Sequence, residues 1–325
     1  MISFEVPSWL IWHYDIVGAI SFIINIFAMF LIVTKSGKKN EFRFYLMYSQ
    51  FSCIIFDLQM SCFMQLCPLF PIVAGFSNGI ASKYLNISTH VLMCLVFLFV
   101  NMQIHSLTMC FIKKHQTLVR IGNTNDLGFW RTRVIYAVCI CWPVFASGVF
   151  YMCELDKNEQ WRQIKELYPS YLSGFQSLRE FTIYDDRNYF TLFAMVQILF
   201  GYSAALFIIP PIAIHMINVL NQNKNQTSAI LMKKHRAAVK GLIAQFSTCP
   251  LTLIPNVFAM LTVVTKFENS QQFIYYVIVV MTIHSMTNSI VIIFSYPDYR
   301  NYVLEILKLR KRVTPKISQT FFVNV

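Results

Sequence analysis

Three polar side chains interrupt long apolar stretches of this sequence, and they are the residues best placed to do chemistry. Asp57 lies inside one stretch, and Asn25 and Asn288 lie in two others at comparable depth. A buried carboxylate is costly unless polar partners surround it. We therefore expect Asn25, Asp57 and Asn288 to form one buried polar cluster with a functional role. The alternative is that Asp57 is neutral and hydrogen-bonded for packing alone.

Histidine and tyrosine side chains are the next candidates, as contacts for a ligand. His90 lies near one end of an apolar stretch, His284 lies deep in another, and Tyr276 lies near the start of the last one. The deep pair His105 and His284 has no supporting carboxylate and no Cys/His spacing of a metal site. Hydrogen bonding in the interior is therefore favoured over metal binding. Tyr276 suits an interfacial anchor as well as a pocket wall.

Catalytic patterns are missing from the sequence. It contains no paired carboxylates, no Gly-rich phosphate loop and no nucleophile constellation. We expect neither an enzyme nor a bound cofactor or metal.

The composition predicts which elements position these residues. Of the 325 residues, 56% are hydrophobic and only 13% are charged, and the mean hydropathy is +0.52. Seven apolar windows are long enough to cross a bilayer and must be helical, since a lone strand would leave its backbone unpaired in lipid. We predict an all-α membrane protein, a seven-transmembrane helix bundle in one domain. The spans are expected at about 11–34, 44–66, 87–112, 134–152, 189–217, 242–265 and 273–296.

The basic residues predict the orientation of the bundle. Of the 27 Lys and Arg residues, 20 follow spans one, three, five and seven, and these segments carry only four acids. Basic loops stay cytoplasmic, so the N-terminus is expected outside and the C-terminus inside. The positive net charge therefore indicates topology rather than nucleic-acid binding. The sequon at Asn86 falls on the expected outer side and is a glycosylation candidate, whereas the sequon at Asn225 falls on the inner side.

The last span is expected to end at Pro297, which cannot continue a helix cleanly. After it, Tyr299, Tyr302, Val303 and Ile306 recur at helical spacing opposite polar residues. We predict a short cytoplasmic amphipathic helix at about 299–312, lying on the anionic inner leaflet. The seven-transmembrane domain then covers 1–312, with a tail at 313–325. An ordinary stop-transfer charge cluster is the alternative.

Several motifs resemble one known family. "MQLCPLFPIVAGF" after span two, "NEFRFYLMYSQFSCIIFDLQ" at the entry to span two and "IHSMTNSIVIIFSYPDYR" at the exit of span seven resemble the nematode serpentine chemoreceptors of class I, which are related to class H. The resemblance extends from Trp9 to Arg312. It implies a G protein-coupled chemosensory receptor in the plasma membrane of sensory cilia, with an external small molecule, a heterotrimeric G protein and the lipid bilayer as partners and no nucleic acid.

The resemblance also implies roles for particular residues. Asn25, Asp57 and Asn288 resemble the sodium-linked polar cluster of rhodopsin-like receptors. Span three ends in "MCFIKKHQ" without Asp-Arg-Tyr, span seven has no Asn-Pro-x-x-Tyr, and the absence of lysine from span seven excludes retinal bound as a Schiff base. The residues expected to face a G protein are Arg120, Lys233, Lys234 and Arg236.

A long polar loop from Cys153 to Asn188 is expected to cap the bundle. Cys67 is the other cysteine clearly near the expected outer face, so a bridge between Cys67 and Cys153 is a candidate. Cys94, near the start of span three, is too deep for this role.

Two other classes of membrane protein compete with the receptor. A seven-helix ligand-gated channel of the odorant-receptor type would carry its N-terminus inside, against the charge asymmetry. A transporter is disfavoured because the halves show no internal repeat.

Overall fold

The computed structural model describes residues 2–37, 41–121, 128–185, 187–223, 228–265 and 269–308. The expected tail 313–325, residues 309–312 of the expected amphipathic helix and the sequon at Asn225 lie outside the described residues. The elements are α1 (Ser8–Lys35), α2 (Phe42–Leu58), the π-helix η1 (Gln59–Met64), β1 (Leu66–Pro68), β2 (Ala74–Ser77), α3 (Ile80–Leu85), α4 (Thr89–Ile121), α5 (Phe129–Tyr151), α6 (Lys157–Leu167), the 3₁₀ turn η2 (Pro169–Tyr171), α7 (Leu172–Ser177), β3 (Thr182–Ile183), α8 (Tyr189–Gln222), α9 (Ala229–Phe246), α10 (Pro250–Thr265), α11 (Ser270–Ser295) and α12 (Pro297–Ile306).

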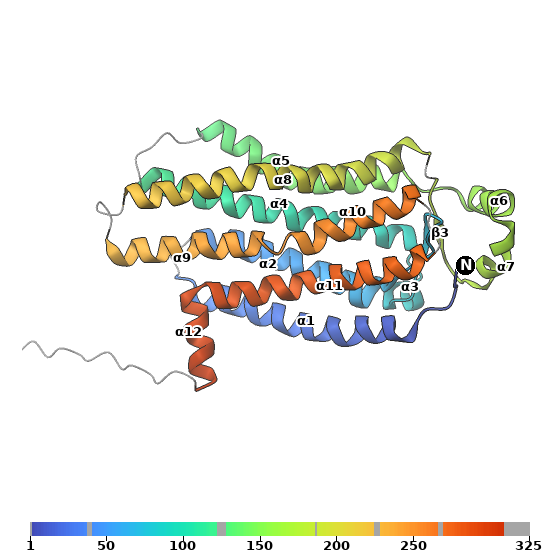
Figure 1. Ribbon diagram of the computed structural model, residues 1–325, viewed down its shortest axis with the longest axis horizontal. Coiled ribbons are helices and arrows are strands. Elements are labelled where there is room, and N and C mark those ends of the chain that lie inside the picture. Colours follow the sequence, from blue (N-terminus) through green and yellow to red (C-terminus); the bar gives the residue numbers. More distant parts are fainter. Residues whose placement is uncertain are drawn as a thin grey trace, which may run out of the picture.

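The long helices lie side by side as one elongated bundle (Figure 1). Each of the seven expected windows falls on helix. Among the described residues, six helices are long and apolar enough to cross a membrane, with α9 and α10 taken as one. The remaining window is α2 followed by η1, which packs against α1, α4 and α11. The seven-transmembrane bundle predicted from the sequence is confirmed.

Two helices extend furthest beyond their expected windows, and both extensions carry charged residues. α4 continues from residue 112 to Ile121, and the sixth span begins at Ala229 rather than near residue 242. Hydropathy alone misses such extensions, since helical hydrogen bonding continues where the chain leaves the apolar layer. Between α9 and α10 the chain breaks at Ser247–Cys249, directly before Pro250, which has no backbone N–H to continue the helical ladder.

One end of the bundle carries a small cap, and we call it the sheet end. β1, β2 and β3 form an antiparallel sheet in that order. α6 and α7 lie beyond it together with the N-terminal segment (Figure 1). Ile2, Cys67, Ile164 and Phe175 belong to one buried cluster there, so the segment expected to cap the bundle packs on the hairpin that follows η1.

The opposite end carries α12, and we call it the α12 end. Pro297 is the first residue of α12, as expected for a residue that starts a helix better than it continues one. The Tyr299 hydroxyl lies 2.6 Å from Ser36 Oγ, and Lys35 Nζ lies 3.7 Å above the Tyr302 ring. α12 is thus fixed to the end of α1 and turns away from the bundle axis (Figure 1).

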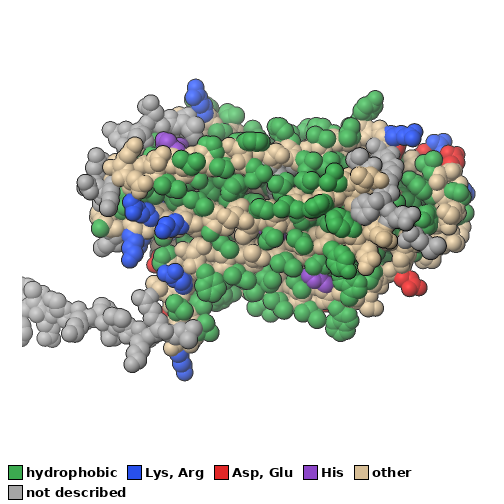
Figure 2. Space-filling model, viewed as in Figure 1, with side chains coloured by type: hydrophobic (Ala, Val, Ile, Leu, Met, Phe, Trp, Pro, Cys, Tyr) green, Lys and Arg blue, Asp and Glu red, His purple; other side chains and the backbone are tan. Residues whose placement is uncertain are grey.

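Hydrophobic and basic side chains lie at different positions along the bundle. In the view of Figure 2, hydrophobic side chains cover the middle of the molecule, and the Lys and Arg side chains lie towards its two ends. Such a band is what the hydrocarbon of a bilayer requires, and the chain is a multi-pass membrane protein.

Candidate functional site

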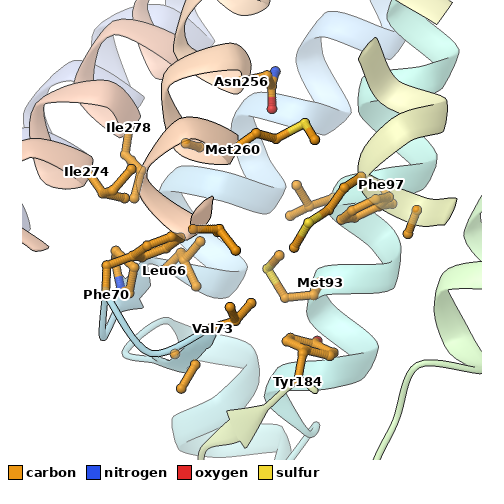
Figure 3. Close-up of a pocket in the computed structure, with 18 of the residues that line it drawn as sticks. Leu66, Phe70, Val73, Met93, Phe97, Tyr184, Asn256, Met260, Ile274 and Ile278 are labelled. Atoms are coloured by element: carbon orange, nitrogen blue, oxygen red, sulfur yellow. The ribbon is translucent and has the colours of Figure 1, made fainter. Parts of the chain in front are cut away.

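A cavity of about 220 Å³ lies inside the bundle near the sheet end. Its floor and walls come from η1, α4, α5, α8, α10 and α11, and the hairpin of β1 and β2 borders it together with β3. Figure 3 shows Phe70 and Val73 of the hairpin, Met93 and Phe97 of α4 and Met260 of α10 around the same space. Segments distant in sequence therefore build one cavity.

The lining of this cavity is almost wholly carbon and sulfur. Among the described residues that line it, none is Asp, Glu, Lys or Arg. The polar side chains are few, and they lie on different elements. They are Thr89, Thr182, Tyr184, Thr191 and Asn256. A pocket of this kind binds through shape and apolar contact, with a few hydrogen bonds to fix orientation.

Tyr184 is positioned by a hydrogen bond to His90, which lies outside the cavity lining. Its hydroxyl lies 3.0 Å from His90 Nδ1, and His90 Nε2 lies 3.2 Å from the carbonyl of Tyr151. Burial raises the pKa of Tyr184 well above its usual value, so the phenol is neutral and available as a hydrogen-bonding group. His90, expected from the sequence to contact a ligand, does not line the cavity and instead supports a residue that does.

The other two expected ligand contacts also lie outside the cavity lining. Tyr276 is 54% exposed, and its ring stacks on Trp9 with the centroids 5.6 Å apart, as an interfacial anchor would. His284 is buried deeper, with Nε2 3.3 Å from Thr248 Oγ1. Thr248 lies in the break between α9 and α10, so His284 contacts this break rather than the cavity.

The expected polar cluster is present around Asn25, which is completely buried. Asn25 Nδ2 donates to Asp57 Oδ2 at 2.6 Å, and Gln50 Nε2 donates to Asn25 Oδ1 at 2.8 Å. Ser21 donates to Asp57 and Ser289 donates to Asn25. Gln50 also donates to Ser289 Oγ at 2.7 Å, which closes the network across α1, α2 and α11.

Asn288 is displaced from this network. Its Nδ2 lies 3.7 Å from Cys53 Sγ and donates to that sulfur, and Ser289 takes the expected place beside Asn25. Successive residues of a helix point about 100° apart, so an error of one position exchanges one side chain for its neighbour. The i and i+4 spacing of Ser21 and Asn25 was the signal in the sequence that could have extended the cluster on α1.

The polar cluster lies between the two main hydrophobic clusters of the bundle. Along α1, Leu10 and Tyr14 belong to the cluster next to the cavity, whereas Ala28 and Leu31 belong to the cluster towards α12. Asn25 lies between these pairs. A hydrogen-bonded layer thus connects the helices at the boundary between the two packed regions.

The residues expected to face a G protein gather at the α12 end. Arg120 is in the last turn of α4, and Lys233 and Lys234 are exposed on α9. Arg236 Nη2 donates to Asn221 Oδ1 at 3.2 Å, which connects α9 with α8. These side chains share one end of the bundle and surround the ends of α4, α8 and α9.

Side-chain contacts connect α4 with its neighbours at the α12 end. Lys114 Nζ lies 2.9 Å from His235 Nδ1 on α9, and His115 Nε2 lies 2.9 Å from His215 Nδ1 on α8. Lys113 pairs with Glu41 at 2.7 Å, and this hydrogen bond and charge lower the pKa of Glu41. In each of the Lys114–His235 and His115–His215 pairs, one imidazole must be neutral so that its nitrogen can accept the hydrogen bond.

The candidate disulfide is not formed. Cys67 and Cys153 are both free thiols. Cys67 Sγ donates to the carbonyl of Gln65 within the cap, whereas Cys153 packs with the bundle beneath it. The two cysteines share an end of the molecule but belong to different packed clusters, a separation that sequence cannot show.

Two further expectations concern modification and metals. Asn86 is exposed at the end of α3, and its Oδ1 accepts a hydrogen bond from Arg179.

Within the part of the chain that the structure describes, no group of three or more His, Cys, Asp or Glu side chains is arranged to hold a metal ion.

Comparison with known proteins identifies the group to which this bundle belongs. The solved structure of squid rhodopsin superposes with a TM-score of 0.59 over 94% of this chain and 87% of that chain, at 14% sequence identity, which shows the fold. No curated protein matches the chain. The profile of the serpentine type 7TM GPCR chemoreceptor Sri matches residues 1–303. This family consists of receptors, which leaves the channel and transporter alternatives without support. The chain therefore belongs to the serpentine 7TM chemoreceptors, the family that its motifs resemble.

Proposed function

We propose that this receptor binds a neutral, mainly apolar small molecule in the cavity at the sheet end and activates a heterotrimeric G protein at the α12 end. The observation that carries the proposal is the lining of this cavity, because it combines carbon-rich walls with a few hydrogen-bonding side chains. A charged ligand would lose its hydration there without gaining an ion pair.

The lining also indicates the breadth of recognition. Five methionines contribute to the walls, and methionine side chains adapt to ligands of different shape. They are Met60, Met93, Met195, Met260 and Met281. Asn256 and Tyr184 approach from different sides of the space (Figure 3), so a ligand with one or two oxygen atoms could hydrogen-bond to either.

The orientation follows from charge. Basic segments cluster on the cytoplasmic side of membrane proteins, which places the α12 end in the cytoplasm and the cap outside. The cavity then faces the surroundings of a sensory cell, in the plasma membrane of its cilia, and Asn86 is on the side where a glycan can be added. α12 lies along the inner leaflet, where its exposed Ile306 and Leu307 contact lipid.

A route from ligand to G protein is available through the sixth span. α10 contributes Asn256, Ala259 and Met260 to the cavity, and α9 presents Lys233 and Lys234 at the α12 end. The break between α9 and α10 allows one to tilt against the other, as at other helix breaks. We infer that ligand binding moves α10, and that α9 then separates from α4 at the Lys114–His235 contact.

The polar cluster is the second region of the receptor that we propose to rearrange on activation. Asn25, Asp57 and Ser289 connect three helices between the cavity and the α12 end. We propose that the network changes partners on activation and that Asn288, one position away, contributes after that change. Arg120, Lys233, Lys234 and Arg236 then contact the G protein.

The test is ligand-dependent nucleotide exchange on a G protein, measured in membranes that contain the full receptor. The probes are neutral alkanols, alkanones and alkyl esters of increasing chain length. Ala259→Phe places a ring in the cavity and is expected to abolish the response. Val257→Phe places the same ring on the outward face of α10, where Val257 is 36% exposed, and is expected to leave the response unchanged.

Two results would overturn the proposal. An Ala259→Phe receptor that keeps the full response of the unchanged receptor would show that the ligand binds elsewhere. A response lost equally in both variants would show that α10 does not tolerate aromatic residues on either face and that the cavity is not the reason.

A further inference from the structure

A second and larger cavity, of about 570 Å³, opens on the side of the bundle between α1 and η1. It shares no lining residue with the first cavity. Its walls come from α1, from the end of α2, from η1 and the residue that follows it, and from the segment around α3. The lining residues are Ile11, Tyr14, Asp15, Gly18, Ala19, Phe22, Asp57, Leu58, Ser61, Cys62, Gln65, Asn78, Ile80, Lys83 and Tyr84.

The backbone of η1 and a glycine of α1 shape this cavity. A π-helical segment widens the turn, and such segments often occur at functional sites. Gly18 lies so close to η1 that a Cβ there would come within 2.4 Å of Ser61 Cβ. α1 and η1 therefore approach each other closely at Gly18.

Charge is distributed unequally along the cavity. Asp15 and Lys83 are exposed at its rim and carry opposite charges, and Gln65 Nε2 donates to Asp15 Oδ1 at 2.8 Å. Asp57 is on the inner wall, eight residues before Gln65, which corresponds to roughly 12 Å along a helix. The rim charges offset each other, so the inner carboxylate sets the electrostatic preference of the cavity.

Asp57 has hydrogen-bond donors but no cationic partner among the described residues. Asn25 and Ser21 both donate to its Oδ2. Within those residues the ion pairs of the chain are Lys113 with Glu41, Lys157 with Glu180 and Arg162 with Glu159, and none involves Asp57. A buried carboxylate without a cation is a place where a ligand cation gains the most.

We propose that this cavity binds a primary aliphatic amine, with its ammonium group on Asp57 and its hydrocarbon chain against Ala19, Phe22 and Leu58. An ammonium group supplies the charge and three donors that a carboxylate accepts. The apolar side chains of Ala19, Phe22 and Leu58 suit an alkyl chain. This site shares no lining residue with the first cavity, but its inner carboxylate, Asp57, also belongs to the polar cluster of the proposed function.

The experiment uses the full chain in lipid nanodiscs and follows its melting temperature with n-alkylamines as probes. n-Alkanols of the same length and sodium chloride are the comparison additives. We expect amines to raise the melting temperature at concentrations where alkanols do not. Asp57→Asn should weaken the effect by at least about tenfold, because a charge-assisted contact is lost.

A second pair of variants keeps the test valid if Asp57→Asn fails to fold. Ala19→Phe fills the cavity from α1 and leaves Asp57 in place, so it should also abolish the effect of amines. Ile20→Phe adds the same bulk on a lipid-facing position and should not, because Ile20 is 46% exposed and does not line the cavity.

Three results would overturn the proposal. Amine protection that survives Ala19→Phe would place the amine elsewhere, and equal protection by alkanols would remove the role of charge. Equal protection by sodium chloride would indicate a site for an inorganic cation alone. Ala259→Phe should leave amine protection intact, so a failure of this site and a failure of the first cavity give different results.

Discussion

Asn25 is the residue through which the hydrogen bonds of the polar cluster connect α1, α2 and α11. Its amide donates to Asp57, and its carbonyl oxygen accepts from Gln50 and Ser289. Three helices are thereby connected through one side chain, in a layer where both neighbouring clusters are apolar. An amide can do this because it carries donors and an acceptor at once.

We expect Asn25→Ala to destabilise the receptor by about 1 to 3 kcal/mol, since it leaves buried polar partners unsatisfied. The check is the melting temperature of the purified protein in detergent. Asn288→Ala is the matched control, because among the described residues that amide donates to the Cys53 thiol at 3.7 Å, and a thiol is a weak acceptor. Equal losses in the two variants would contradict the central place of Asn25.

Cys67 and Cys153 allow a second prediction at this scale. Burial raises the pKa of the Cys67 thiol to about 12, and burial also raises that of Cys153, so both are neutral thiols at physiological pH. We expect reductant to leave the melting temperature unchanged, whereas loss of a disulfide would cost about 2 to 5 kcal/mol.

Mass spectrometry gives the direct check on these cysteines. Alkylation of the unfolded, unreduced chain should label both residues. A peptide pair joined through Cys67 and Cys153 would restore the bridge that the sequence suggested.

Some of this residue-level detail was predictable and some was not. Asn25 and Asp57 were paired correctly because depth in a helix can be counted along the sequence. Ser289 was missed in favour of Asn288, since rotation about the helix axis depends on packing that no count reveals. His90 is expected from the sequence to contact a ligand, yet in the structure its imidazole contacts Tyr184, which lies in a loop 94 residues further on.

At the scale of elements, η1 and the segment after it position much of what the receptor uses. η1 separates the two cavities, and Gln65 ends it in a left-handed conformation with φ of 46°. Directly after β2, Gly79 lies against η1, where an added Cβ would come within 2.3 Å of the Phe63 carbonyl oxygen. This close approach fixes α3 and the sheet on the end of the second span.

We expect Gly79→Ala to lower the melting temperature and to weaken ligand binding in the first cavity, because the backbone of η1 must move away. Gly148→Ala is the matched control in α5, where an added Cβ meets nothing within 4 Å and alanine favours a helix. It should be neutral or slightly stabilising. If both variants melt at the same temperature as the unchanged receptor, the contact between Gly79 and η1 does not fix the cap.

The elements themselves were largely predictable, because apolar length fixes where a chain can cross a bilayer. The unpredicted parts are those where hydropathy carries no signal. α9 was missed at its start since Lys233 and Lys234 are charged, and the change from α-helix to π-helix within the second span depends on its contacts with α1 and α3. The first cavity was also unpredictable, because its walls come from six helical elements, a hairpin and β3.

At the scale of the whole molecule, the two ends have different chemistry. The sheet end holds the cap and both cavities, and the α12 end holds exposed basic side chains around α4, α8 and α9. The polar cluster lies between them. A receptor needs such a division, because the ligand and the G protein are on opposite sides of the membrane.

The accessibility of tags at the two termini tests this division most directly. Antibody is applied first to intact cells that express the receptor and then to permeabilised cells. An N-terminal tag that is labelled on intact cells, with a C-terminal tag labelled only after permeabilisation, is the predicted result, since it places the cap and its cavities outside. The reverse pattern would put the basic α12 end outside and the cavities on the cytoplasmic side, and it would contradict the proposed reception of an external signal.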